Sequence, residues 1–144
     1  MTVTTTRGTQ YGNSVISKDP DYVDLDLDFF ANPTTKDVVK KSGNEAIKRS
    51  VRNLIFTNYY EKPFRPDVGS GVRELLFENA TPLTIIYLQD AIKLLLVNYE
   101  PRIQLISVIV TDDLDNNGFN VSLEYIILNR QQRVVSTLFL ERIR

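Results

Sequence analysis

Residues 81–103 have the sequence TPLTIIYLQDAIKLLLVNYEPRI, and this stretch organises the rest of the chain. Thr81 is a favoured helix N-cap, and Pro82 suits the first helical position, where its missing N–H has no intrahelical partner to lose. Pro101 disfavours helical geometry at the residue before it, so the helix should end near residues 98–99. Apolar residues between these limits recur at helical spacing and predict one buried side. They are Ile85, Leu88, Ile92, Leu95 and Leu96.

The residues after this helix predict a small sheet. Three runs rich in β-branched or alternating apolar side chains lie at 103–110, 121–127 and 134–140. Polar turns at 112–118 and 129–132 connect them. Successive strands with short connections form an antiparallel meander.

A second amphipathic helix is predicted upstream, beginning near Ser42. Ser42 and Glu45 have the spacing of a capping box. The fold class is therefore α+β, with two main helices packed on a small antiparallel sheet and a C-terminal three-strand meander. The apolar stripe of this helix consists of Ile47, Val51, Leu54 and Ile55. Its basic outer face, either solvated or docked on an acidic neighbour, consists of Lys48, Arg49 and Arg52.

Residues Tyr22–Phe29 alternate apolar side chains with Asp24, Asp26 and Asp28. This period of two predicts a strand with its apolar face half-buried. The three aspartates share the other face and repel one another. They would be held most easily in water at a sheet edge, or opposite a basic partner.

Composition limits what the chain can be. Its 144 residues suit a single domain, and we expect a flexible N-terminal arm at residues 1–20 followed by one domain at 21–144. A net charge of −1 argues against a general nucleic-acid binder, which needs a strong positive field. The chain contains neither cysteine nor histidine, which excludes disulfides and the commonest general base. No apolar stretch is long enough for membrane insertion.

One segment has the residues of a calcium-binding loop but not its structural context. Residues 113–124 match the EF-hand loop pattern, with Gly118 at the sharp turn and Glu124 as the bidentate ligand. That motif needs a helix on each side, whereas strands are predicted here. A hairpin turn of Asp, Asn and Gly explains the same residues.

A hydrolase with paired carboxylates is the natural enzymatic alternative for a chain of this composition. Cleavage of a sugar bond needs two carboxyl groups, one of them with a raised pKa. The available residues are Glu74, Glu78 and Asp90. Because nothing in the sequence indicates an apolar pocket around them, we expect a non-enzymatic protein.

Two blocks carry a resemblance to a known family: LFENATPLT at Leu76–Thr84 and NYEPRI at Asn98–Ile103. Together they closely resemble the baseplate wedge and sheath-initiator family of contractile-tailed phages, whose relatives occur in type VI secretion baseplates. Residues 65–69 resemble the Pro/Gly loop of that family, and residues 43–55 resemble its first helix. The resemblance spans about residues 22–140.

This resemblance implies a structural subunit of the virion tail baseplate, assembled in the host cytoplasm and present in multiple copies around the tail tube. The implied partners are other baseplate wedge proteins and the tail sheath protein, without a cofactor. The family's Glu-Pro-Arg signature, linked to assembly, falls on Glu100, Pro101 and Arg102. We expect these residues also to form a joint between the long helix and the first meander strand. A lysozyme label carried by some family members keeps the hydrolase as an alternative.

The last predicted strand, from Arg133 to Arg144, would be a sheet edge if it ends the meander. An exposed edge invites addition of a strand from a partner. Under the sheath-initiator interpretation the first sheath ring joins there, and removal of residues 134–144 should block sheath recruitment. The assigned interaction residues are Val134, Ser136, Leu138 and Leu140.

Overall fold

The long helix has the limits that its sequence predicts. In the computed structural model, which describes residues 21–142, helix α3 spans Pro82–Tyr99. Thr81 Oγ1 accepts a hydrogen bond from the backbone N–H of Thr84 at 3.2 Å, as an N-cap should. The helix ends just before the Glu-Pro pair that contains Pro101.

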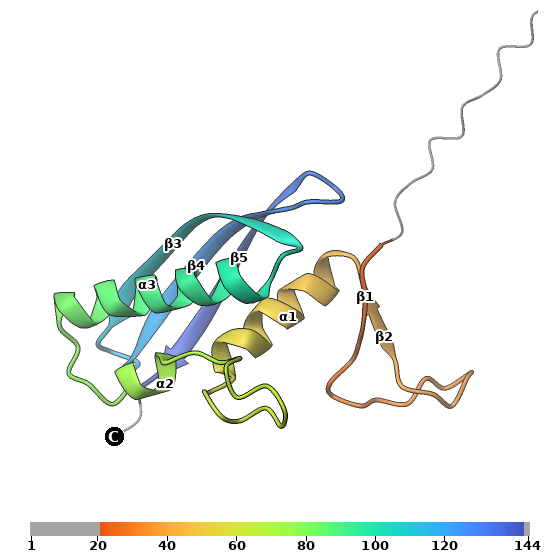
Figure 1. The fold of residues 1–144 in the computed structure, drawn as a ribbon, viewed down its shortest axis with the longest axis horizontal. Coiled ribbons are helices and arrows are strands. Elements are labelled where there is room, and N and C mark those ends of the chain that lie inside the picture. Colours follow the sequence, from red (N-terminus) through yellow and green to blue (C-terminus); the bar gives the residue numbers. More distant parts are fainter. Residues whose placement is uncertain (1–20, 143–144) are drawn as a thin grey trace, which may run out of the picture.

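The chain after α3 forms a three-stranded antiparallel sheet in the order β3-β4-β5, which confirms the predicted meander (Figure 1). Alternate side chains of the central strand point into the core and are almost fully buried. They are Phe119, Val121, Leu123, Tyr125 and Ile127. The strands are β3 (Ile103–Asp113), β4 (Gly118–Ile127) and β5 (Gln132–Glu141).

The residues that match a calcium-binding loop form the predicted hairpin turn. Asp113 ends β3 and Gly118 begins β4, so the turn lies between two strands. Glu124 lies within β4 and forms an ion pair with Arg133 of β5.

Helices α1 (Asn44–Phe56) and α3 pack on the apolar face of this sheet, which confirms the predicted α+β architecture (Figure 1). Helix α3 lies along β3, and α1 lies beside β5, with which it lines two hollows. The short helix α2 (Val72–Leu75) adds Val72 to the core. All four residues of the predicted α1 stripe are buried, as are four of the five in α3, with Ile85 partly buried.

The predicted capping box at the start of α1 is wrong. Ser42 belongs to a short strand, β2 (Lys40–Ser42), which the sequence analysis missed. Gly43 is the N-cap, with a positive φ of 62°, and no side chain caps the helix. Its backbone N–H donates to Tyr22 O at 2.8 Å. A glycine suits this conformation because it has no Cβ to clash.

The predicted strand at Tyr22–Phe29 is shorter than expected and faces the opposite way. Strand β1 covers only Val23–Leu25 and pairs antiparallel with β2. Asp26 is 2% exposed and Asp24 is partly buried, so these two carboxylates are turned toward the protein, whereas Asp28 stays exposed. The expectation of a half-buried apolar face is wrong: Val23, Leu25, Leu27, Phe29 and Phe30 are 50–67% exposed. The alternative, aspartates held opposite a basic partner, is confirmed within the chain itself.

The Pro/Gly-rich segment 62–71 forms turns and is closed by a parallel bridge between Asn58 and Ser70. The predicted arm at residues 1–20 lies outside the described residues. Between residues 21 and 142, no helix combines the length and apolar character needed to cross a membrane.

Candidate functional site: the Glu-Pro-Arg joint

Glu100 is buried at the C-terminal end of α3. It is 2% exposed, and its backbone N–H donates to Leu96 O at 3.0 Å. Ser50, on the facing side of α1, donates its hydroxyl to Glu100 Oε2 at 2.5 Å. A carboxylate removed from water needs such donors, because desolvation penalises its charged form.

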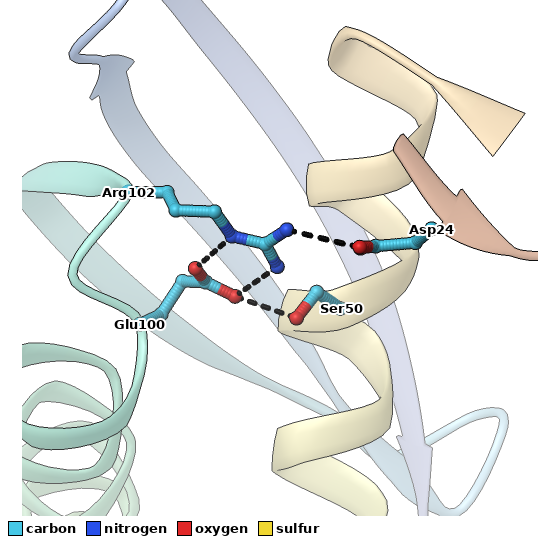
Figure 2. Close-up of polar contacts among 4 residues, drawn as sticks. All are labelled: Asp24, Ser50, Glu100 and Arg102. Carbon is cyan, nitrogen blue, oxygen red and sulfur yellow. Dashed lines mark hydrogen bonds and ion pairs between the residues drawn. The ribbon is translucent and has the colours of Figure 1, made fainter. Parts of the chain in front are cut away.

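Arg102 supplies the main counter-charge to Glu100 (Figure 2). Its Nε donates to Glu100 Oε1 at 2.6 Å and its Nη2 donates to Oε2 at 2.9 Å. The planar guanidinium matches the two carboxylate oxygens, which makes this a bidentate ion pair. The pair spans Pro101, so the turn after α3 is held by its own two flanking side chains.

The third guanidinium nitrogen of Arg102 reaches the N-terminal hairpin, which consists of β1, β2 and the segment between them. Its Nη1 lies 3.2 Å and 3.1 Å from the two carboxylate oxygens of Asp24 in β1. The Tyr22 ring lies beneath the guanidinium, 5.5 Å from Cζ to the ring centre. Figure 2 shows Asp24, Ser50, Glu100 and Arg102 together. These four residues, together with Pro101, form the joint. The joint connects the end of α3 to α1 and to β1.

The charges of the joint stabilise each other. Burial by itself raises the pKa of Glu100, but hydrogen bonds from Arg102 and Ser50 and the guanidinium charge outweigh it. The pKa of Glu100 therefore lies below its ordinary value of 4.5. Hydrogen bonding to Glu100 raises the pKa of Arg102 above its ordinary value. Both groups remain ionised at neutral pH, so neither is suited to exchange protons there.

Further ion pairs fasten the same hairpin to the body. Asp26 lies 3.0 Å from Arg49 and 3.3 Å from Lys41, and Arg49 also pairs with Asp28. Burial alone would raise the pKa of Asp26. Hydrogen bonds from the Asp28 N–H and Lys41, together with the charges of Lys41 and Arg49, lower the pKa by more, so the net shift is downward. Arg49 belongs to the predicted basic face of α1, and its acidic partners come from the same chain.

An open hollow lies beside Pro101. Its volume is about 660 Å³, and its walls come from the hairpin, α1, the 62–71 segment and the joint. Pro101 is exposed, in contrast to Glu100. Lys62 and Arg65 also line this hollow and carry positive charge. The tripeptide thus divides into two charged residues used inside the chain and a proline that faces outward.

The sequence-predicted residues fall into two separate places. Glu100, Pro101 and Arg102 lie together at the joint, whereas the four assigned residues of β5 lie on the strand face turned toward the helices. Val134 and Leu140 are buried there, and Ser136 and Leu138 are partly buried. The outward-facing residues of β5 are Arg133, Val135, Thr137, Phe139 and Glu141.

The partners of the joint carry little signal in the sequence. Ser50 lies between apolar stripe positions of α1 and carries no motif. Asp24 gave the only detectable signal, since three alternating aspartates favour either a solvated sheet edge or a basic partner. Nothing in the sequence shows that this partner is 78 residues away, at Arg102.

The carboxylates of the hydrolase alternative are all exposed and do not form one site. Glu74 lies in α2 and Glu78 follows it, whereas Asp90 lies on α3 beside β3. A carboxylic acid that protonates a leaving group needs apolar enclosure to hold its proton near neutral pH. These exposed positions do not provide it.

The chain shares its sequence pattern with a known protein family. The family model described as "Baseplate wedge protein gp25" matches residues 41–132. The chain belongs to the gp25 family of baseplate wedge proteins. It is 34% identical to the baseplate wedge protein gp25 of Enterobacteria phage T4 over 94 residues, which cover 65% of this chain and 71% of that protein.

Two solved structures share the fold. A Geobacter sulfurreducens protein named as a candidate tail lysozyme is 27% identical, with a TM-score of 0.63 over 74% of this chain and 98% of that one. A chain of the anti-feeding prophage baseplate is 21% identical, with a TM-score of 0.62 over 88% and 90% of the two chains. The latter likeness shows the fold alone.

Membership of the gp25 family identifies a structural protein of the tail baseplate. Ser50, Glu100 and Arg102 lie inside the matched segment, whereas Asp24 precedes it. The matched segment also stops where β5 begins, at Gln132. Strand β1 and most of β5 therefore lie outside the matched segment.

Proposed function

We propose that this baseplate wedge subunit helps to start the tail sheath by offering the open edge of β5 to a strand of the first sheath ring. The observation that supports this proposal is the topology: within residues 21–142, β5 pairs with β4 alone. Its outer edge therefore presents backbone donors and acceptors to a partner, as in other cases of strand addition.

The other edge of the sheet is less suited to this role. Strand β3 contains a register shift between Leu105 and Ser107, which indicates a bulge. Bulges interrupt the regular spacing of edge groups and discourage strand addition. Strand β5 keeps one unbroken register with β4 from Gln132 to Glu141.

The register also identifies which β5 groups face outward. Arg142 N donates to Asn117 O, and this pair continues the β4–β5 register. Hydrogen-bonded and non-hydrogen-bonded pairs alternate in an antiparallel ladder. The N–H groups of even-numbered β5 residues thus point to β4, and those of Val135, Thr137 and Phe139 point to the open edge.

A proline at Thr137 tests the proposal. Thr137→Pro removes one outward N–H and places a ring on the edge, while the ladder to β4 is kept. Thr137→Ala keeps the N–H and is the matched control. We expect Thr137→Pro to lower capture of tail sheath protein by at least about ten-fold, and Thr137→Ala to leave it unchanged.

The measurement is co-sedimentation of purified sheath protein with assembled baseplates, with thermal unfolding of each variant as the check on folding. Normal capture by a folded Thr137→Pro variant would contradict the proposal. Removing residues 134–144 should also block recruitment, but it takes away the buried Val134 and Leu140, so the proline variant is the sharper test.

The joint and its hollow are proposed to meet the other baseplate wedge proteins, in multiple copies around the tail tube after assembly in the host cytoplasm. The charges of Glu100 and Arg102 bond within the chain, so we expect them to act by positioning Pro101 and the hairpin. Residues 21–144 would act as one domain in this assembly.

No catalytic role is proposed. Activity on bacterial cell walls that disappears in Glu74→Gln or Glu78→Gln would contradict this part of the proposal.

A further inference from the structure

Two adjoining hollows follow the side of β5 that lies beside α1. The first, of about 250 Å³, is walled by Ser136 and Leu138 of β5 and by charged side chains of α1 and β2. The second, of about 360 Å³, continues along β5 past Leu140. The charged walls of the first are Lys41, Glu45, Lys48, Arg49 and Arg52. Apolar residues that line the second on the α1 side include Ile55, Phe56, Val72, Leu76 and Leu140.

The first hollow has an excess of positive charge that faces the edge of β5. Two of its cations, Lys41 and Arg49, are engaged by Asp26 in the hairpin. Lys48 pairs with Glu45 at 3.1 Å, but both side chains are largely solvated, and such pairs contribute little. These contacts leave the ammonium of Lys48 available to an incoming carboxylate.

Arg52 marks the boundary between the two hollows. Its guanidinium lies 5.6 Å from the centre of the Phe56 ring, an arrangement typical of a cation–π contact. Arg52 lines the first hollow and Phe56 lines the second. The two hollows, together called the groove, therefore follow one another along β5, the first mainly cationic and the second mainly apolar.

The register of a strand added to β5 determines which of its side chains enter this groove. Side chains of paired residues lie on the same face of a sheet. Positions opposite Ser136, Leu138 and Leu140 would therefore point toward α1. Positions opposite Val135, Thr137 and Phe139 would point to the outer face.

We infer that the strand received by β5 carries an acidic side chain opposite Ser136 or Leu138 and a large apolar side chain opposite Leu140. The acidic side chain meets Lys48 and Arg52, and the apolar one enters the second hollow. This inference rests on the proposed strand addition and adds the chemistry of the partner. Backbone bonds at the edge supply affinity, and the groove selects the sequence.

Charge reversal in the groove provides the first test. The double variant K48E/R52E should lower sheath capture by at least about ten-fold, because the incoming carboxylate would face two like charges. The control K36E/K93E makes the same change in net charge at two exposed lysines outside the groove, and it should capture sheath normally. Capture by the parent protein should weaken as salt is raised.

Strand peptides provide the second test. The probes are nine-residue threonine-rich peptides with Glu at two alternate positions and Leu two residues further, made in both chain directions, and twins with Lys in place of Glu. The Glu peptides should displace sheath from the full-length protein at a concentration at least about ten-fold lower than their Lys twins. K48E/R52E should reverse this preference.

The outcomes separate this inference from the proposal on which it rests. Suppose that Thr137→Pro loses capture of sheath, and that the Glu and Lys peptides compete equally or not at all. Strand addition is then supported, and the acidic-strand inference is overturned. Normal capture in Thr137→Pro overturns strand addition itself. Loss of capture in K48E/R52E but not in Thr137→Pro would show a partner that occupies the groove without pairing with β5, which also overturns the inference.

Discussion

Helix α3 buries Leu88 and Ile92 against the sheet, whereas the hairpin of β1 and β2 buries the carboxylate of Asp26 and leaves its apolar side chains exposed. The body is thus held by removal of apolar area from water, and the hairpin by ion pairs with Arg49, Arg102 and Arg130. Apolar burial hardly depends on salt or pH, whereas ion pairs depend on both. The two regions should therefore respond differently to the same perturbations.

The largest difference is expected from one substitution made in both regions. Leu88→Ala, at a residue 0% exposed, should lower the free energy of unfolding by about 3 kcal/mol, since it leaves a cavity in the core. Leu25→Ala, at a hairpin residue 56% exposed, should change it by less than about 0.5 kcal/mol. Urea unfolding of the two variants checks this. Comparable losses would mean that the hairpin also depends on apolar burial.

Breaking the joint should cost nearly as much as the core cavity. Arg102→Ala leaves the Glu100 carboxylate buried without its counter-charge, at a cost of about 3 kcal/mol in unfolding free energy. Arg102→Lys keeps the charge but loses the bidentate geometry, so its unfolding free energy should lie between those of the parent protein and Arg102→Ala. NMR titration of the Glu100 carboxyl gives a second readout: its pKa should rise in Arg102→Ala. A variant with unchanged stability and an unchanged pKa would show that the joint does not stabilise the fold.

Acid should weaken the joint before it affects apolar packing. Because the folded-state pKa of Glu100 is below 4.5, its stabilising contribution is complete above that pH and is lost as the pH falls through the folded-state value. We expect the urea concentration at the unfolding midpoint to decrease once the pH is below about 4.5. Glu100→Gln should reduce this dependence, whereas Leu88→Ala should keep it. Equal pH profiles for the parent and Glu100→Gln would argue against a role for this carboxyl.

Salt should produce the smallest effect, and one confined to the hairpin. The pairs Asp28–Arg49 and Asp21–Arg130 are partly exposed, so screening should weaken them. Exchange of the Asp26 amide, which donates to Val39 O, should accelerate by less than about ten-fold in 0.5 M salt. Amides of β4 should not change. Uniform acceleration in both regions would indicate that hairpin and body open together.

The parts of the fold that the sequence predicted correctly depend on local signals. Thr81, Pro82 and Pro101 define α3 through capping and through the geometry of proline, which act within a few residues. The meander follows from alternation such as that of Val121, Leu123 and Tyr125, interrupted by turn residues. These signals need no knowledge of distant parts of the chain.

The errors lie where two distant segments compete for the same residues. Ser42 has the chemistry of a helix cap, yet it pairs with Val23 as part of β2. The capping position passes to Gly43, whose amide satisfies Tyr22. A sequence window around α1 contains no information about this partner.

The sequence by itself determined the long helix, the three-strand sheet and the alternation of apolar and acidic residues in β1. An alternating strand has two faces, and the sequence alone did not say which one the protein covers. Only the tertiary structure decided this, because it brings Arg49 and Arg102 together opposite Asp24, Asp26 and Asp28. Several close ion pairs, which also compensate the buried carboxylate of Asp26, outweigh a few exposed apolar side chains there. The same packing turned Glu100 and Arg102 inward and left Pro101 and the edge of β5 facing outward.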